Sequence, residues 1–327
     1  MHARHWQAGL HEVARIIRRA PARTFARAFR LTLALAGFAA LATVCPATES
    51  PTPAPHVTWG GFVLADAGLR TPESVLHDPI ADVYLVSNVN GAPDAKDDNG
   101  FISRVSPDGR VLAIAWIDGA AKEVTLNAPK GMALHGDSLF VADIDAVRIF
   151  SRTTGEPRGA IPIAEAVFLN DLAVSDDGTL YVSDMRTNRI HRIGADMRTS
   201  VVVHNANIAQ PNGLTICADT LWIARSVAAR ISALDVSDDK EAHLLREVGV
   251  PAAGLDGLVR LPDGTLLVSS WVAQSVYRIA PSGEASLLFD HLPAPADIGL
   301  DFSRGLLLIP FFNDDKIEAR PLDQAGK

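Results

Sequence analysis

The chain has 327 residues, of which 48% are hydrophobic and 21% charged, a balance typical of a soluble globular protein with a large core. Its net charge of −8 is unevenly distributed, because the first 30 residues carry seven arginines and one glutamate. The remaining residues hold 23 basic and 37 acidic side chains, a net charge of −14. Such an acidic surface repels polyanions, so we expect no nucleic-acid partner.

Residues 1–47 have the pattern of an export signal or N-terminal anchor. A basic stretch is followed by the apolar run LTLALAGFAALATV at residues 31–44 and then by small residues. This run is shorter than the roughly 20 apolar residues of a membrane span. We therefore expect an exported protein, periplasmic or secreted, with no membrane span in the mature domain. Anchoring by an uncleaved leader is the alternative.

A proline-rich linker, residues 48–56, separates this leader from the domain predicted at residues 57–327. Only two cysteines occur in the whole sequence, Cys45 and Cys217. Because Cys217 lies in the apolar run LTIC, we expect it to be a buried small hydrophobe.

Short β-type segments follow the linker along the whole domain. In chain order they include VYLVS, FISRVS, LFVAD, VRIFS, LYVSD, IHRIG, LWIAR, ISALDV, LLVSS, VYRIA, LLLIP and IEARPL. Alternating or aliphatic runs of this length predict strands. The segments SPDGR, SDDGT, LPDGT and PSGE lie between them, and their Asp-Gly or Ser-Gly pairs predict tight hairpin turns.

A repeated frame organises these strands into units. A polar anchor followed by small and aliphatic residues recurs at intervals of 57, 40, 42, 44 and 41 residues. The six anchors are Glu73, Lys130, Asn170, Asn212, Asp256 and Asp297. Repeats of about 40 residues with four strands each bury their faces by packing radially. The sequence thus predicts an all-β, six-bladed β-propeller of four-stranded antiparallel blades, closed by an N-terminal strand from residues 56–64.

One segment departs from the repeat. NVNGAPDAKDDNG, residues 88–100, is longer than its counterparts and rich in Asn, Asp and Gly. It is either an ordinary solvated loop or a lid, because loops between second and third strands open on the same face as the anchors.

The six anchors should face the central channel, since each begins the innermost strand of its unit. Five of them carry side-chain oxygens, the ligands that a hard cation such as Ca²⁺ requires. We therefore expect one divalent cation here, with Ca²⁺ favoured over Mn²⁺, Mg²⁺ or Zn²⁺. Solvated or backbone-capping side chains at the channel mouth are the alternative. Converging carboxylates without a cation would repel one another, and Lys130 is the one ring residue that could relieve this repulsion.

With these residues in view, the chain resembles the gluconolactonase/senescence-marker-protein (regucalcin-like) family of six-bladed propellers. The resemblance covers residues 57–322 and is carried by PES, FLND, QPNGL and LDGL. It implies Glu73, Asn212 and Asp256 as ligands of one metal ion, and Asn170 and Asp171 as substrate contacts. The implied reaction is opening of a sugar lactone ring, with the metal polarising the carbonyl and Asp256 as general base.

The chain also departs from the family pattern. Ser74, Val75 and Leu76 replace the usual proline and aromatic residue, and Phe168 stands where some members have a substrate-binding arginine. Lys130 and Asp297 add charges at ring positions, and we assign both to substrate binding. Two functions follow: a metal-dependent lactonase-like hydrolase, or a non-catalytic propeller that binds a metabolite, glycan or peptide on its channel face.

Overall fold

The computed structural model describes residues 60–204, 208–238 and 241–324, which form six four-stranded antiparallel sheets. The leader at residues 1–47, the linker at residues 48–56 and the start of the expected closing strand lie outside these ranges, so export remains a prediction. Within the described ranges, no helix is long and apolar enough to cross a membrane.

The first three sheets each use four consecutive strands. Blade 1 contains β2 (Pro72–Asp78), β3 (Val83–Asn88), β4 (Phe101–Val105) and β5 (Val111–Asp118). Blade 2 contains β6 (Pro129–His135), β7 (Ser138–Asp143), β8 (Ala146–Ser151) and β9 (Pro157–Pro162). Blade 3 contains β10 (Leu169–Val174), β11 (Leu180–Asp184), β12 (Arg189–Ile193) and β13 (Thr199–His204).

The last three sheets complete the ring. Blade 4 contains β14 (Pro211–Cys217), β15 (Thr220–Arg225), β16 (Arg230–Asp235) and β17 (His243–Gly249). Blade 5 contains β18 (Leu255–Arg260), β19 (Leu266–Ser270), β20 (Ser275–Ile279) and β21 (Ala285–Phe289). Blade 6 contains β22 (Gly299–Asp301), β23 (Leu306–Phe311), β24 (Lys316–Pro321) and, on its outer edge, β1 (Phe62–Leu64). A short 3₁₀ helix, η2 (Leu322–Gln324), follows β24.

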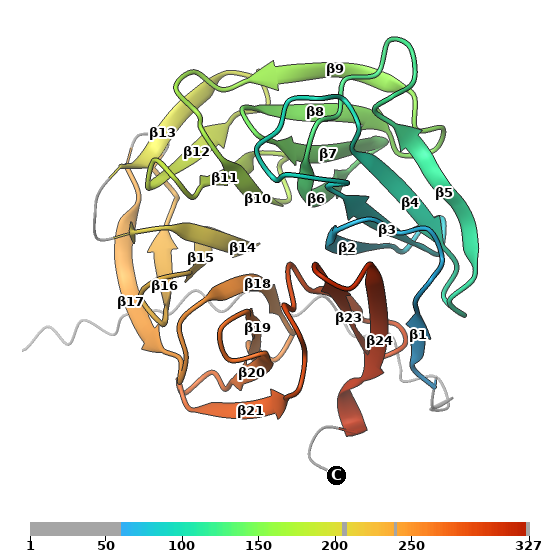
Figure 1. Ribbon diagram of the computed structural model, residues 1–327. Helices are drawn as coiled ribbons and strands as arrows, with labels where there is room; N and C mark the ends of the chain where they lie inside the picture. Colours follow the sequence, from blue (N-terminus) through green and yellow to red (C-terminus); the bar gives the residue numbers. More distant parts are fainter. Residues whose placement is uncertain (1–59, 205–207, 239–240, 325–327) are drawn as a thin grey trace, which may run out of the picture. The chain divides into compact units, whose positions relative to one another are not determined.

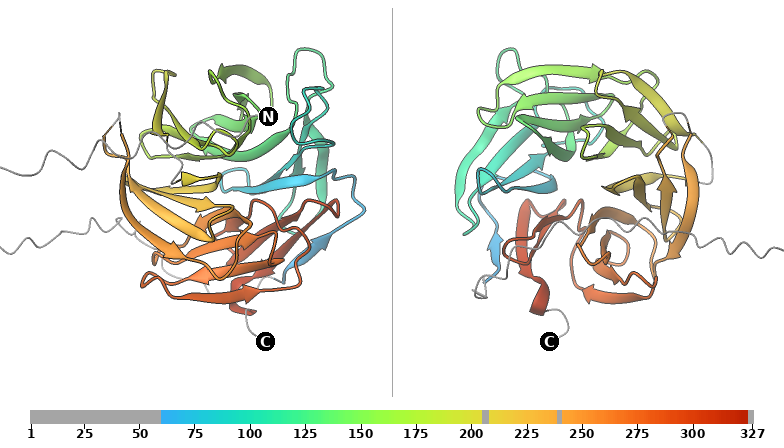
Figure 2. Two further views of the ribbon diagram at one scale, coloured as in Figure 1. Left: turned by 60° about the vertical axis from the view of Figure 1, so that its left-hand side comes forward. Right: turned by 180° about the vertical axis from the view of Figure 1, so that it is seen from behind.

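The sheets are arranged as blades around one axis, with β2, β6, β10, β14 and β18 innermost (Figure 1). The views in Figure 2 show the same ring from the side and from behind. The all-β, six-bladed propeller predicted from the repeat is therefore confirmed, including its closure by an N-terminal strand. Glycines of the predicted turns have left-handed backbone, with φ of 84° at Gly109 and 87° at Gly178.

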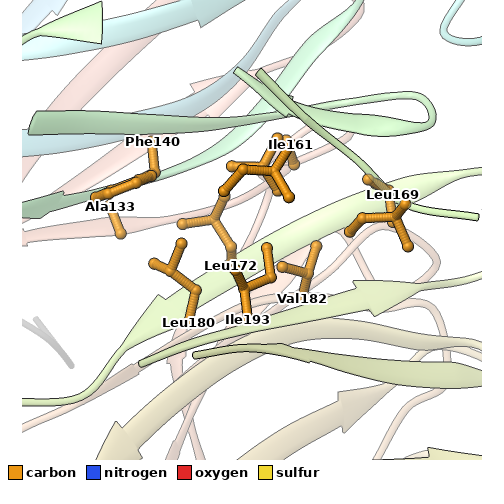
Figure 3. Close-up of a cluster of buried hydrophobic side chains, with 11 residues drawn as sticks. Ala133, Phe140, Ile161, Leu169, Leu172, Leu180, Val182 and Ile193 are labelled. Carbon is orange, nitrogen blue, oxygen red and sulfur yellow. The ribbon is translucent and has the colours of Figure 1, made fainter. Parts of the chain in front are cut away.

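Apolar side chains fill the space between neighbouring blades. One cluster joins β6, β7 and β9 of blade 2 to β10, β11 and β12 of blade 3 (Figure 3). Phe140 and Ile161 from blade 2 pack there with Leu172 and Val182 from blade 3. Each blade buries one face against the next, which explains the short alternating and aliphatic runs of the sequence. This packing between blades also holds the inner strands in place.

Ring closure depends on more than the short outer strand. Only three residue pairs join β1 to β24, from Phe62↔Ala319 to Leu64↔Ile317. At one end of the blade 6 to blade 1 junction, Arg304 forms a forked ion pair with Asp82, with Nη2 and Oδ2 2.7 Å apart. These contacts tie the first and last blades together independently of the outer strand.

Cys217 corrects one expectation. It is partly exposed at the end of β14, so it is not the fully buried residue that the apolar run LTIC predicted.

Candidate functional site

Five of the six anchor residues lie at β-bulges or register shifts at the start of the inner strands, whereas Asp297 precedes β22. In blade 3, Leu169 pairs with Asp184 and Leu172 with Val182, so two inner-strand residues face one residue of β11. The same register shift occurs in blades 2, 4 and 5, and blade 1 has a related one at Glu73. A bulge interrupts the alternation of side chains and redirects the inserted residue. The same bulge at the start of the inner strand thus orients the polar anchors of several blades.

The glycine after several anchors permits close approach of the next inner strand. A Cβ on Gly213 would lie 2.1 Å from the Asp256 carbonyl oxygen, and one on Gly257 would lie 2.2 Å from the Ile298 nitrogen. Both distances are shorter than any non-bonded contact allows. Blade 3 has Asp171 at this position instead. The small residue of the repeated frame is therefore a packing requirement of the channel wall.

Asp171 connects blades 3 and 4. Its Oδ1 accepts a hydrogen bond from Leu172 N at 2.7 Å, and its Oδ2 accepts one from Leu214 N at 2.6 Å. Its own amide donates to Ser183 Oγ at 3.0 Å. Both carboxylate oxygens thus accept hydrogen bonds from the backbone. The expected substrate contact of Asp171 stays a prediction, and a substrate would have to share these oxygens with the backbone.

All six predicted ring residues are buried, each with a relative exposure of 8% or less. Their electrostatic coupling shows that residues of distant blades converge. Burial raises the pKa of Glu73 well above its ordinary value, and the carboxylates of Asp256 and Asp297 raise it further, whereas Lys130 opposes the change. Burial also raises the pKa of Asp171, together with the charges of Asp297 and Asp256.

Asp256 and Asp297 share this environment. Burial, with the neighbouring Asp297 charge, raises the pKa of Asp256 to about 8, opposed by the nearby N–H groups of Trp271 and Asn212. Burial raises the pKa of Asp297 to about 7, opposed by a 2.5 Å hydrogen bond from Ser74 Oγ to its Oδ2. Acids that titrate near neutrality can accept or release protons at physiological pH.

The ring contains buried oxygens without partners. Glu73 Oε2, Asn170 Oδ1, Asn212 Oδ1 and Asp256 Oδ1 accept no hydrogen bond from the described residues. Buried polar atoms almost always have a partner, so such a group requires an explanation. Carboxylate and amide oxygens are the ligands that a hard divalent ion prefers, and three of the four belong to the expected ligand set.

Acidic side chains alone do not complete a cation site. In the described part of the chain, no three His, Cys, Asp or Glu side chains are grouped closely enough to hold a metal. An ion here would therefore need the amide oxygen of Asn212 between the carboxylates of Glu73 and Asp256. Asn212 is itself held in place, since its Nδ2 donates to the Leu255 carbonyl oxygen at 3.3 Å.

Comparison with known families agrees with this geometry. The family model described as "SMP-30/Gluconolactonase/LRE-like region" matches residues 102–296, more than half of the chain. The chain belongs to this family. The match includes Lys130, Asn170, Asn212 and Asp256, whereas Glu73 lies before it. No curated protein matches the sequence.

Solved structures share the fold of this SMP-30/gluconolactonase family member at low identity. A structural-genomics protein with a provisional gluconolactonase assignment is 15% identical, with a TM-score of 0.63 over 80% of this chain and 91% of its own. Virginiamycin B lyase from Staphylococcus aureus is 13% identical, with a TM-score of 0.59 over 79% and 97%. A streptogramin B lyase is 12% identical, with a TM-score of 0.58 over 80% and 98%. At these identities the likeness concerns the fold alone.

Residues at the ends of second strands hold neighbouring loops in this family member. Asp143 accepts hydrogen bonds from the amides of Asn127 and Ala128 and from Arg148 Nε. Asp184 similarly accepts from the amide of Val167 at 2.8 Å. Their carboxylates are therefore occupied by the scaffold, in contrast to the unpartnered oxygens of the ring.

Two features of the site are not apparent from the repeat. Trp271 lies between Asp256 and Phe312, 5.2 Å from the Phe312 ring centroid, and its buried Nε1 has no hydrogen-bond partner. Ser74, which bonds Asp297, stands where three other frames have glycine, one has aspartate and the last has isoleucine. Trp271 directly follows β19 at the end of a second strand, and no sequence pattern pairs Ser74 with Asp297.

Proposed function

We propose that this protein is a divalent-metal-dependent hydrolase that opens lactone rings, in the manner implied for the SMP-30/gluconolactonase family. The observation that carries the proposal is the set of buried, unpartnered oxygens on Glu73, Asn212 and Asp256. The propeller fold itself does not require polar oxygens at this place in the frame. At the next position, Gly131 and Gly213 have no side chain at all.

Glu73, Asn212 and Asp256 would hold the ion, with Ca²⁺ favoured by an all-oxygen set that contains neither His nor Cys. When bound, the ion supplies Lewis acidity that polarises the lactone carbonyl and makes a nearby water more acidic. The raised pKa values of Glu73 and Asp256 reflect repulsion and burial in the metal-free site. A cation would relieve both effects, so the charge of the site fits the ion.

Asp256 is the proposed general base. Its carboxylate is buried beside Asp297, and an aspartate that titrates near neutrality can take a proton from water and return it to the leaving oxygen. Asn212 and Trp271 hold N–H groups near this carboxylate. Asp297 can share the proton, because ionisation of either acid makes ionisation of the other less favourable.

Asn170 is the proposed substrate contact. Its Nδ2 rests on Met185 Sδ at 3.6 Å, while its buried Oδ1 has no partner and can accept a hydrogen bond from a ligand hydroxyl. Lactone hydroxyl groups supply such donors, which supports a sugar lactone as the substrate class. Phe168 stands where some family members have a substrate-binding arginine, so this contact would be absent here.

A second candidate is a non-catalytic ligand-binding propeller, and one observation favours it. Lys130 places a buried ammonium among the acids, a charge that suits an anionic ligand. Under this alternative, ligand binding would occur with no turnover under any metal.

The test compares wild type, Asp256→Asn and Asp290→Asn after chelation and after addition of Ca²⁺ or Mn²⁺, with a panel of sugar lactones. Asp290 is an exposed acid on the outside of the same blade and controls for loss of one charge. We expect metal-dependent hydrolysis that Asp256→Asn reduces by at least about 100-fold and Asp290→Asn leaves unchanged. Equal activity of both variants, or turnover that is indifferent to chelation, would reject the proposal.

A further inference from the structure

The channel face carries two cations on one aromatic ring. Lys130 Nζ lies 4.6 Å from the centroid of Phe168, and the guanidinium carbon of Arg186 lies 4.4 Å from the same centroid. Phe168 itself is buried, with 9% exposure. Two positive groups, one from blade 2 and one from blade 3, thus lie against the same aromatic ring, although their charges repel.

Lys130 has few partners for a buried ammonium. Its side chain is almost completely buried, and its hydrogen bond within the described residues goes to the Ala128 carbonyl oxygen at 2.9 Å. The described residues form no ion pair between Lys130 and Glu73, whose Oε2 is unpartnered. Burial lowers the pKa of Lys130 to about 8, opposed by the charges of Glu73, Asp143 and Asp94, so the ammonium predominates at neutral pH.

The long loop at residues 89–100 brings a carboxylate to these cations. Asp94 Oδ2 lies 2.9 Å from Arg186 Nη1, and both side chains are half-exposed at the channel mouth. The charge of Asp94 also acts on Lys130. One carboxylate is therefore within the influence of both cations.

The acids and the cations occupy different sides of the channel. Glu73, Asp256 and Asp297 belong to blades 1, 5 and 6, whereas Lys130 and Arg186 belong to blades 2 and 3. A ligand that spans the channel would meet oxygen ligands at one end and positive charge at the other.

We propose that Lys130 and Arg186, which flank Phe168, form a subsite for a carboxylate group of a small-molecule ligand, and that Asp94 of the loop occupies it as an internal stand-in. A ligand carboxylate displaces Asp94 from Arg186 and gains the charge-assisted hydrogen bonds that Asp94 now makes. A planar guanidinium suits a carboxylate in particular, because its N–H groups match the two carboxylate oxygens. The substrate class that follows, a lactone or ester that bears a separate carboxylate, rests on the hydrolase function proposed above, whereas the subsite itself does not.

The loop is attached at a second point. Lys96 Nζ lies 2.5 Å from Asp145 Oδ2, in the turn between β7 and β8. This pair is exposed and distant in the chain from Arg186. Its removal should loosen the loop while Asp94 keeps its ion pair with Arg186. It supplies the control that separates loop mobility from competition by Asp94.

The experiment measures binding of glucarate, a sugar diacid, and of glucitol, its neutral counterpart, by calorimetry at pH 6.5 in the presence of a chelator. Wild type should prefer glucarate at least tenfold. Arg186→Met and Lys130→Met should each lose that preference about tenfold, whereas Asp94→Asn should strengthen glucarate binding several-fold. Lys96→Met should leave the ratio of the two affinities unchanged.

Because Lys130 is buried, the half-exposed Arg186 and Asp94 decide the outcome if Lys130→Met does not fold. Glucarate binding that Arg186→Met leaves intact, or that Asp94→Asn fails to strengthen, would overturn the proposal. So would Lys96→Met acting in the same way as Asp94→Asn, since loop mobility would then explain the gain. Metal and turnover do not enter this assay, so its failure would leave hydrolysis of neutral lactones untouched.

Discussion

Ser74 Oγ donates a 2.5 Å hydrogen bond to Asp297 Oδ2 across the junction of the first and last blades. The backbone reinforces this contact, because Asp297 N donates to the Glu73 carbonyl oxygen at 2.9 Å and the two segments form a parallel bridge. The residue that closes the ring on its inner side is thus also one of the acids of the candidate site. Propeller closure and the electrostatics of the channel are coupled at this point.

Ser74→Ala should destabilise the protein more at high pH than at low pH. A hydrogen bond to an ionised acceptor is worth about 1.5–3 kcal/mol, and one to a neutral acceptor about 1 kcal/mol. Since the pKa of Asp297 is about 7, the larger loss should appear at pH 8.5 and the smaller one at pH 5. Urea unfolding of both proteins at the two pH values measures the difference, and an equal loss at both would show that Asp297 is not the acceptor that matters.

Metal-free protein should lose stability as the pH rises from 5 to 7.5. Burial and mutual repulsion raise the pKa of Asp256 to about 8 and of Asp297 to about 7, above the value near 4 of an unfolded aspartate. Their neutral forms therefore stabilise the folded state at low pH, and this contribution is lost as the pH rises through the folded-state values. Lys130, whose pKa is lowered to about 8, changes its contribution only above this range.

Thermal unfolding in a chelator should therefore show a midpoint several degrees lower at pH 7.5 than at pH 5. Saturating Ca²⁺ should remove most of this difference, because the ion compensates the ionised carboxylates. A midpoint that rises with pH in the chelator would contradict the account.

The glycine of the repeated frame should not tolerate a side chain. Gly257→Ala would place a Cβ 2.2 Å from Ile298 N and 2.6 Å from Asp297 Cα, both of which are backbone atoms that cannot move independently. We expect a loss on the order of 3 kcal/mol. Gly249→Ala, in the outer strand β17, meets nothing within 4 Å and should change stability by less than about 0.5 kcal/mol. Equal effects in denaturant titrations would contradict this view of the channel wall.

A buried ion pair should hold blades 1 and 2 together. Burial tends to raise the pKa of Asp78, but hydrogen bonds from Arg152 and from the amides of Ala81 and Ile80 outweigh it and leave the pKa below its ordinary value. Asp78 therefore stabilises the fold above pH 4 and loses this effect as the pH falls through its folded-state pKa.

Asp78→Asn should cost about 3 kcal/mol at pH 7, because it leaves the largely buried Arg152 without its charged partner. Asp137→Asn removes a similar but exposed pair with Arg158 and should cost much less stability, because solvent screens that pair. Chemical unfolding at pH 7 distinguishes the two, and similar losses would show that Arg152 finds another partner.

The propeller could be predicted because its determinants are periodic in the chain. The anchors, strands and Asp-Gly turns repeat about every 40 residues, and only one arrangement buries all those faces. The same period predicts that Glu73, Asn212 and Asp256 converge on one ion, and this assignment stays a prediction. The Ser74–Asp297 bond and the Asp94–Arg186 pair could not be predicted, since they join residues 223 and 92 positions apart and the repeat does not specify which side chains pair.

The role of Lys130 was only partly visible. Its ring position was clear from the frame APKGMAL, and an anionic ligand could be suggested from its charge. Phe168 lies against Lys130 and Arg186 because of the way blades 2 and 3 pack. The sequence pattern does not show this packing.

Anomalous diffraction from crystals soaked in Mn²⁺ tests the central claim most directly, since it locates the ion without reference to turnover. The account predicts one strong peak in the channel, about 2.0–2.6 Å from carboxylate oxygens of Glu73 and Asp256 and from Oδ1 of Asn212. Soaked crystals of Asn212→Ala should lose the peak, because the remaining acids cannot hold the ion alone. A channel without a peak, or a peak bound by other residues, would contradict the account.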